Sequence, residues 1–154
     1  PRGTGQQGFR LLLATDGSDC SLAAAREVAS RPWPAGSEVQ VVSAVEILAA
    51  AIEPFFPGPR IVTQVQEESA SISETAVREA AALLDASGLK TSVKLLKGDS
   101  KEQIVRYARE WHADLVVVGT HTRHGLSLLL EGSVSEAVAL ESECSVLVVR
   151  EARA

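Results

Sequence analysis

Several features are scarce in this chain of 154 residues, and each absence excludes a class of protein. All strongly apolar runs are far shorter than the roughly 20 residues that cross a bilayer, so no membrane partner is expected. The net charge is −5 with the signs mixed along the chain. We see no clustered basic stripe of the kind typical of nucleic-acid binding, so no nucleic-acid partner is expected. Paired catalytic carboxylates, His-Glu-x-x-His and metal-ligand spacings are also absent, which favours a binding module over a dedicated enzyme.

Methionine and cysteine are similarly rare. The chain has no methionine, so we expect its natural start to be missing or processed. Its two cysteines, Cys20 and Cys144, match no metal or redox spacing, which predicts a reduced, cytoplasmic protein. A disulfide between them is the alternative. Residues 1–8 lack the apolar core of a signal peptide and are predicted to form a flexible lead.

Short apolar segments alternate with helical patterns from residue 9 to 150. The apolar segments predict five buried strands, at Phe9–Ala14, Val39–Val45, Val93–Leu96, Ala113–Val118 and Val146–Val149. Four helices are predicted between them, one capped by Ser18 or Asp19, one at Thr63–Ala86, one capped by Asp99 or Ser100, and one at Ser133–Leu140. This alternation is typical of one domain with a parallel sheet covered on both faces, followed by a tail at 151–154.

Two of the predicted helices carry an apolar stripe. In the first the stripe consists of Leu22, Ala25, Val28 and Ala29. In the longest helix it consists of Val65, Ile72, Ala76, Ala80 and Leu83. The proline-rich segment before the longest helix holds Phe55-Phe56, which we expect to pack on the body or, alternatively, on a partner subunit.

The ends of the first and fourth strands are the expected ligand site. In an open parallel sheet, ligands bind outside the carboxyl ends of the strands where the strand order reverses. There Asp16 is a candidate to accept hydrogen bonds from a ribose or to help hold a metal, and it is equally a candidate turn residue. The helix starting near Ser133 offers backbone N–H groups to a phosphate. Ser133 and Glu136 also have capping-box spacing, and the two interpretations are compatible.

Other ionisable residues near this site have weaker signals. Arg123, between His121 and His124, is a candidate for a charge-assisted bond to phosphate, although such loop residues are commonly only solvent-exposed. His112 is predicted to be structural. Cys20 lies in the first turn of a helix, which lowers a thiol pKa, but with no base nearby we expect it to be inert.

Three stretches together resemble the universal stress protein family over about residues 9–150. They are Leu11–Ser18, then Gly98-Asp99 with Ile104 and Ala113–Gly119, and finally Gly125–Val134 closing on Cys144–Arg150. The resemblance implies an open five-stranded parallel sheet of order 3-2-1-4-5, Rossmann-like and similar to adenine nucleotide alpha hydrolases. It also implies a stress-response role and a homodimer, commonly built by pairing the last strands.

Many family members bind ATP through Gly-x-x-Gly-x9-Gly-Ser/Thr, which here would begin at Gly119 and end at Gly132-Ser133. The resemblance therefore implies ATP, or AMP or ADP, with Mg²⁺ and with Asp16 as a candidate metal ligand. Adenine and ribose would face Ala14, Thr15, Asp16, the backbone of Val45, and Val118 as the pocket wall. The remaining candidates follow the fourth strand or begin the next helix: Gly119, Thr122, Arg123, Gly132, Ser133 and Val134.

Two positions depart from the family pattern. Thr122 replaces the second motif glycine, and a left-handed conformation there would cost on the order of 1–2 kcal/mol, or roughly tenfold in affinity. Glu131 places a negative charge where members usually carry an apolar residue. Both favour an alternative, a dimeric interaction protein of the same fold that binds no nucleotide. A third hypothesis is a small hydrolase or redox protein using Cys20 or Asp16.

Overall fold

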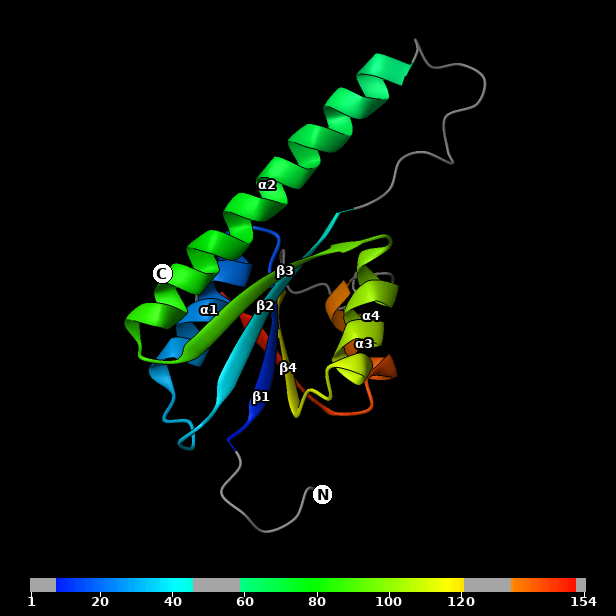
Figure 1. Ribbon diagram of the computed structural model, residues 1–154. Helices are drawn as coiled ribbons and strands as arrows, with labels where there is room; N and C mark the ends of the chain where they lie inside the picture. The colour runs from blue at the N-terminus through cyan, green and yellow to red at the C-terminus, as the bar shows by residue number, and fades with distance from the viewer. Residues whose placement is uncertain (1–7, 46–58, 121–133, 152–154) are drawn as a thin grey trace.

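The computed structural model describes residues 8–45, 59–120 and 134–151. Strands and helices alternate along the chain (Figure 1). They are β1 (Arg10–Ala14), α1 (Asp19–Ser30), β2 (Glu38–Val45), α2 (Pro59–Ala86), β3 (Lys90–Lys97), α3 (Ser100–Glu110), β4 (Leu115–Thr120), α4 (Val134–Glu141) and β5 (Ser145–Arg150). No helix in these ranges is long and apolar enough to span a membrane.

The five strands form one parallel sheet in the order β3-β2-β1-β4-β5. This confirms the predicted fold class and strand order. In the centre, Leu13 of β1 is in register with Val41 of β2 on one side and with Val117 of β4 on the other. The chain leaves β1 toward β2 and β3, and later returns on the other side of β1 with β4 and β5. The strand order therefore reverses between β1 and β4.

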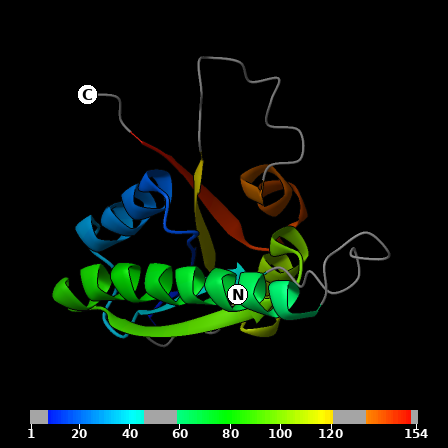
Figure 2. The same cartoon turned by 90° about the horizontal axis from the view of Figure 1, so that it is seen from above.

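Helices cover both faces of the sheet, with α1 and α2 on one face and α3 and α4 on the other (Figure 2). Successive residues of a strand point to opposite faces, so β1 contributes to two cores. Leu11 and Leu13 are fully buried with Val28 of α1 and Leu84 of α2. On the opposite face lie Leu12, Ala14, Val118, Ile104 of α3 and Val138 of α4.

The strand predictions were least accurate at β3 and β4. β3 spans Lys90–Lys97, twice the predicted Val93–Leu96, because pairing with β2 extends it over polar residues. β4 lies two residues later than predicted at both ends, so Gly119 and Thr120 are strand residues and not part of the loop. The ends of β1, β2 and β5 match the prediction or differ from it by one residue.

The predicted stripe of α2 was partly wrong. Ile72 is 65% exposed and Val65 is 43% exposed. The N-terminal end of α2 extends beyond the sheet, which leaves Val65 exposed (Figure 1). Ile72 lies off the packed face of the helix, since its neighbour Ser73 is buried. The face that packs against the sheet is Ser73, Ala76, Val77, Ala80 and Leu84. The helix also begins four residues earlier than predicted, with Pro59, a residue suited to a first turn.

The N-caps of α1 and α3 are residues that the sequence predicted as caps. Ser18 is the N-cap of α1 and accepts a hydrogen bond from the N–H of Ser21. Asp99 is the N-cap of α3 and accepts one from the N–H of Glu102. In the first helix Ala25 and Val28 are buried as predicted, together with Ala24. Leu22 and Ala29 are only partly buried.

Candidate functional site

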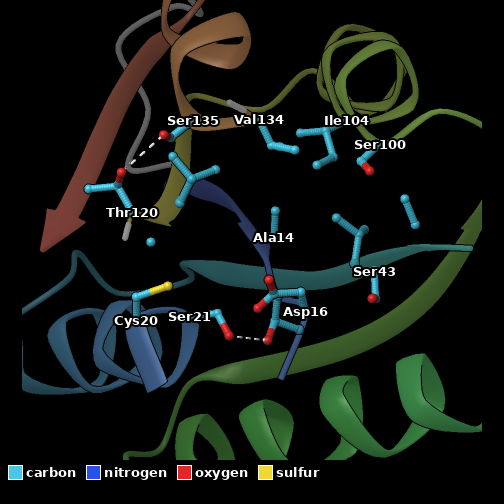
Figure 3. Close-up of a pocket in the computed structure, with 15 residues that line it drawn as sticks. Ala14, Asp16, Cys20, Ser21, Ser43, Ser100, Ile104, Thr120, Val134 and Ser135 are labelled. Atoms are coloured by element: carbon cyan, nitrogen blue, oxygen red, sulfur yellow. Dashed lines mark hydrogen bonds between the residues drawn. The ribbon is translucent and has the colours of Figure 1, made fainter. Parts of the chain in front are cut away.

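A cavity of about 400 Å³ lies at the carboxyl ends of β1, β2 and β4 (Figure 3). It occupies the place where the strand order reverses, which is the usual ligand position in open α/β sheets. Its wall is formed by three strands and by the first turns of three helices. The lining residues are Ala14, Thr15, Asp16, Cys20, Ser21, Val42, Ser43, Ala44, Ser100, Ile104, Val118, Gly119, Thr120, Val134 and Ser135.

Three helices begin at this cavity. Ser21 lies in the first turn of α1, Ser100 is the first residue of α3, and Val134 is the first residue of α4. The first N–H groups of a helix have no partner within the helix and carry partial positive charge. The cavity is therefore suited to a ligand that combines an apolar part with hydrogen-bond acceptors or negative charge.

The turn between β1 and α1 is held by side-chain hydrogen bonds. The N–H of Ser18 donates to Oδ1 of Asp16 at 2.9 Å, and the Ser18 hydroxyl donates to the same oxygen. Gly17 takes a φ of 82°, and its N–H donates to Oγ1 of Thr15 at 3.2 Å. Asp16 is thus a turn residue and also lines the cavity. The two interpretations of Asp16 that the sequence left open are compatible.

Buried hydroxyl groups connect the walls of the cavity. Thr15 Oγ1 donates to Ser21 Oγ at 3.0 Å, and Ser21 Oγ donates to the carbonyl of Ser18 at 2.8 Å. Across the cavity, Ser135 Oγ of α4 donates to Thr120 Oγ1 of β4 at 3.3 Å (Figure 3). These bonds fix the start of α1 to β1 and the start of α4 to β4. The polar part of the wall is consequently preorganised.

Gly119 has a packing role that the sequence did not reveal. A Cβ atom at this position would lie 2.3 Å from the carbonyl oxygen of Cys20 and 2.8 Å from the nitrogen of Ser21. Real Cβ atoms do not approach backbone so closely. The first turn of α1 therefore packs directly on β4, and any side chain at 119 would push the two elements apart. This requirement for glycine is independent of any phosphate.

The structure brings together six of the predicted site residues on the cavity wall: Ala14, Thr15, Asp16, Val118, Gly119 and Val134. Val45 is not part of the wall. Its carbonyl accepts a hydrogen bond from the N–H of Gly98 at 2.9 Å, and its neighbours Ser43 and Ala44 line the cavity instead. The other candidates lie outside the described residues, as do the two phenylalanines: Thr122, Arg123, Gly132, Ser133, His121, His124, Glu131, Phe55 and Phe56.

Sequence reasoning missed several wall residues. Val42, Ser43 and Ala44 come from β2, and Ser100 and Ile104 come from α3. The signal was available for the first three, because the carboxyl end of β2 meets the same sheet edge as that of β1. For α3 the signal was its cap at Asp99, which starts the helix at that edge.

Cys20 corrects one expectation. Its side chain is only 3% exposed, and Figure 3 shows it beside the cavity. Burial raises the pKa of the Cys20 thiol, and the charge of Asp16 raises this pKa further, while the hydrogen bond with Ser18 lowers it. The position near a helix N-terminus does not produce the lowered pKa that the sequence suggested. Neither Cys20 nor Cys144 forms a disulfide, so the alternative pairing was wrong.

A second hollow, of about 390 Å³, lies at the opposite end of the sheet. His112 borders it, follows the C-cap of α3 and has a φ of 56°. Its N–H donates to the carbonyl of Arg109 at 3.1 Å. The charged groups around it bond to protein groups. Arg109 is 3.0 Å from Glu143, and Asp114 accepts from the N–H of Arg10 at 2.9 Å. Because these charged groups already have partners in the protein, this hollow offers a ligand mainly packing contacts.

No cluster of three or more His, Cys, Asp or Glu side chains suited to a metal ion occurs in the described ranges. In the cavity wall Asp16 is the single carboxylate among the described residues. A cation bound there would need further ligands, such as the phosphate oxygens of a nucleotide.

Comparison with known proteins identifies the family. A family model described as "Universal stress protein family" matches residues 9–150. The chain belongs to the universal stress protein family. A universal stress protein of Thermus aquaticus is 33% identical to it over 141 residues, covering 91% of this chain and 97% of the relative.

Solved structures of universal stress proteins share the fold. UspA from Lactobacillus plantarum has a TM-score of 0.73 at 21% identity, with 95% of this chain and 100% of that chain covered. A universal stress protein in complex with cAMP has a TM-score of 0.61 at 27% identity, covering 93% of this chain and 97% of that chain. The Rossmann-like fold expected from the sequence is thereby confirmed.

Proposed function

We propose that this universal stress protein binds an adenine nucleotide, namely ATP or else AMP or ADP, in the cavity at the ends of β1 and β4. The observation that carries the proposal is the cavity itself, which has a suitable volume and lies where the strand order reverses. The related structure in complex with cAMP supports an adenine nucleotide as the ligand class. The protein would act as a cytoplasmic regulator, with nucleotide occupancy changing partner binding.

Each part of the nucleotide has a matching part of the wall. The adenine ring would pack against apolar groups of Ala14, Ile104 and Val118. The ribose would meet Asp16, whose carboxylate is held by Ser18. The phosphates would lie near Gly119 and the first N–H groups of α4 at Val134. Ser133, Gly132, Thr122 and Arg123 remain proposed phosphate contacts.

Magnesium fits this site only together with the nucleotide. Asp16 would supply one oxygen ligand, and the phosphates would supply others, as is usual for Mg²⁺. The ion would neutralise part of the phosphate charge near the Asp16 carboxylate. We therefore expect Mg²⁺ to strengthen ATP binding more than AMP binding.

Isothermal titration calorimetry with AMP, ADP and ATP, with and without Mg²⁺, tests the proposal. Ala44 lines the cavity, so Ala44→Phe should fill it and weaken binding at least roughly tenfold. Ala81→Phe is the matched control, because Ala81 is also partly buried but packs against the core of the opposite face. Equal binding by both variants, or no binding by the parent chain, would overturn the proposal.

A second candidate function is a dimeric interaction protein that binds no nucleotide. One observation favours it, since the described wall residues include Asp16 but no lysine or arginine to balance phosphate charge. The two candidates separate on the variant Thr122→Gly. Binding of ATP that appears only in Thr122→Gly would support the second candidate, whereas binding by the parent chain would support the first.

We propose no catalytic residues and at most slow ATP hydrolysis. A hydrolase needs a base placed to activate water, and in the described wall the titratable side chains are Asp16 and Cys20. Asp16 is held in the turn by Ser18, and burial raises the pKa of Cys20. Phosphate release well above background that is lost in Asp16→Asn would contradict this.

We also propose a homodimer formed through β5, built from one domain at 9–150 with a short lead at 1–8 and a tail at 151–154. β5 is at one end of the sheet and has β4 as its strand neighbour. Val148 on this strand is 40% exposed, and Leu140 on α4 is 78% exposed. An exposed apolar strand edge tends to pair with another chain, and a second copy of β5 would cover it.

A further inference from the structure

All four lysines of the chain lie within one short stretch of the structure. Lys90, Lys94 and Lys97 are on β3, and Lys101 is in the first turn of α3. The chain as a whole carries a net charge of −5. Positive charge is therefore concentrated in one part of a protein whose net charge is negative. We call these four side chains the lysine edge.

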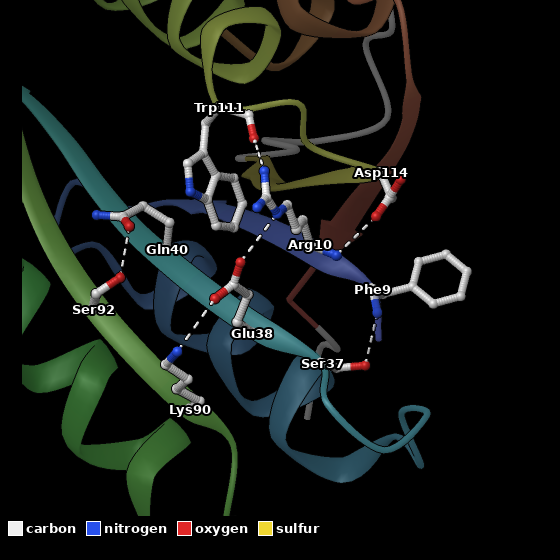
Figure 4. Close-up of polar contacts among 9 residues, drawn as sticks. All are labelled: Phe9, Arg10, Ser37, Glu38, Gln40, Lys90, Ser92, Trp111 and Asp114. Atoms are coloured by element: carbon white, nitrogen blue, oxygen red, sulfur yellow. Dashed lines mark hydrogen bonds and ion pairs between the residues drawn. The ribbon is translucent and has the colours of Figure 1, made fainter. Parts of the chain in front are cut away.

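The lysines differ from the arginines in how they are paired. Five arginines form ion pairs of 3.1 Å or shorter with glutamates: Arg10, Arg31, Arg78, Arg106 and Arg109. Of the lysines, Lys90 forms one long pair of 3.7 Å with Glu38 (Figure 4). Lys97 and Lys101 form no ion pair with any described residue. The positive charge of the lysine edge is thus largely uncompensated.

Three of the four side chains of the lysine edge lie on β3, which is an end strand of the sheet. β3 pairs with β2 on one side, and on its other side the described part of the chain supplies no strand. Its exposed residues include Ser92, Val93 and Lys94. Ser92 bonds inward to Gln40 of β2 (Figure 4). Val93 is 47% exposed. An edge strand offers a row of backbone N–H and C=O groups to a further strand.

We propose that the lysine edge binds an extended acidic peptide segment of a partner protein, which adds to the sheet as a sixth strand beside β3. Backbone pairing would provide affinity, and the lysines would select glutamate or aspartate side chains. Lys90 and Lys94 share one face of the strand, so acidic residues at alternate positions of the peptide would meet them. Val93 and Lys97 would contact the other face of the peptide.

The charge pattern and the surroundings of β3 also argue against two other binding partners, a second copy of the chain and a nucleic acid. A second copy of β3 would bring lysines opposite lysines, which is unfavourable. A nucleic acid would meet the positive charge but would lack a stacking surface. The aromatic ring that a lysine of this edge contacts is Tyr107, and Lys94 Nζ already lies over it at 4.6 Å from the ring centre. An acidic strand would pair with the lysine charges and with the backbone N–H and C=O groups of the β3 edge.

Fluorescence anisotropy with a labelled octapeptide of alternating glutamate and threonine tests this inference, because β3 has eight residues. We expect saturable binding that weakens at least several-fold when NaCl is raised from about 50 to about 300 mM. The double variant Lys94→Glu/Lys97→Glu should weaken binding roughly tenfold or more. Amide chemical-shift changes should be concentrated between residues 90 and 97.

The matched control is Arg26→Glu/Arg31→Glu, which makes the same change in net charge on α1 and on the residue that follows it. α1 packs over β4 and β5. It should bind like the parent chain. A peptide with N-methyl groups at alternate residues keeps its charge but loses backbone donors, and should bind at least several-fold more weakly. Equal binding by both double variants, or tighter binding of a single-stranded RNA of matched charge, would overturn the inference.

Discussion

The two edges of the sheet are built in opposite ways. β3 carries three lysines over the segment Lys90–Lys97, whereas β5 reads Ser-Val-Leu-Val-Val-Arg with its single charge at the last position, Arg150. Each is an end strand with one strand neighbour in the described sheet. Lysine on an edge strand opposes pairing with a second copy, and an apolar edge invites it. This difference is what the two proposals require, with β5 as the edge for self-association and β3 as the edge for a different partner.

A matched pair of valines makes the comparison testable. Val93 on β3 is 47% exposed and Val148 on β5 is 40% exposed. They have the same side chain and similar exposure, but different surroundings. Val93 is adjacent to Lys94, while Val148 lies on the same strand face as Val146, which packs against the α3 and α4 core. Their substitution should therefore have different consequences for assembly.

The largest expected effect is that of Val148→Lys. If two copies pair through β5, the substitution introduces two lysines into one symmetric interface. We expect the dimer dissociation constant to rise at least about 100-fold, so that the protein sediments as a monomer at micromolar concentration. Analytical ultracentrifugation measures this directly.

Val93→Lys is the control for that experiment. It adds the same charge to the other edge and should leave the dimer unchanged. A monomeric parent chain, or an equal loss of dimer in both variants, would contradict the assignment of β5 as the self-association edge.

The second effect is a gain of association when β3 is made to resemble β5. The triple variant Lys90→Val/Lys94→Val/Lys97→Val removes the charges that separate copies at this edge. We expect species larger than a dimer that grow with protein concentration in static light scattering. The matched control, the same three lysines changed to arginine, keeps the charge and should remain unassociated beyond the dimer.

The contrast between the edges was only partly visible in the sequence. β1, β2 and β5 are rich in Leu and Val, and their apolar runs predicted them to within one residue at each end. β3 was half missed because lysine, serine and threonine interrupt its pattern. Its length is set by pairing with β2, from Lys90 opposite Glu38 to Lys97 opposite Val45. Pairing between distant residues is tertiary information that a local pattern does not hold.

The candidate site likewise combines residues that the sequence order predicts with features that depend on tertiary packing. Asp16, Thr15 and Val118 were predicted because they end central strands, which is a property of sequence order. The packing of Gly119 on the backbone of Cys20 required the position of α1 over β4. The position of Cys20 near a helix N-terminus suggested a lowered thiol pKa. In the folded protein burial raises this pKa, and burial again depends on how the elements pack.

A smaller effect is expected from Leu140→Ser, next to the β5 edge. Leu140 on α4 is 78% exposed, so a second copy would cover only part of its side chain. Losing this contact on both copies should raise the dimer dissociation constant about tenfold. Ile72→Ser is the control, because Ile72 is 65% exposed on α2, which covers the β2 and β3 part of the sheet. Equal weakening by both variants would place the interface elsewhere.

The smallest effect, and the one that separates the edges without mutation, is that of salt. At about 300 mM NaCl the screening length is shorter than at about 50 mM, so binding of the acidic octapeptide at β3 should weaken several-fold. The proposed association through β5 would bury apolar groups, which salt does not screen, so its dissociation constant should change by less than about twofold. Sedimentation and anisotropy on the same samples measure both. If the dimer weakened in parallel with the peptide complex, charge and not apolar contact would hold β5 to its copy, and the two edges would no longer differ in kind.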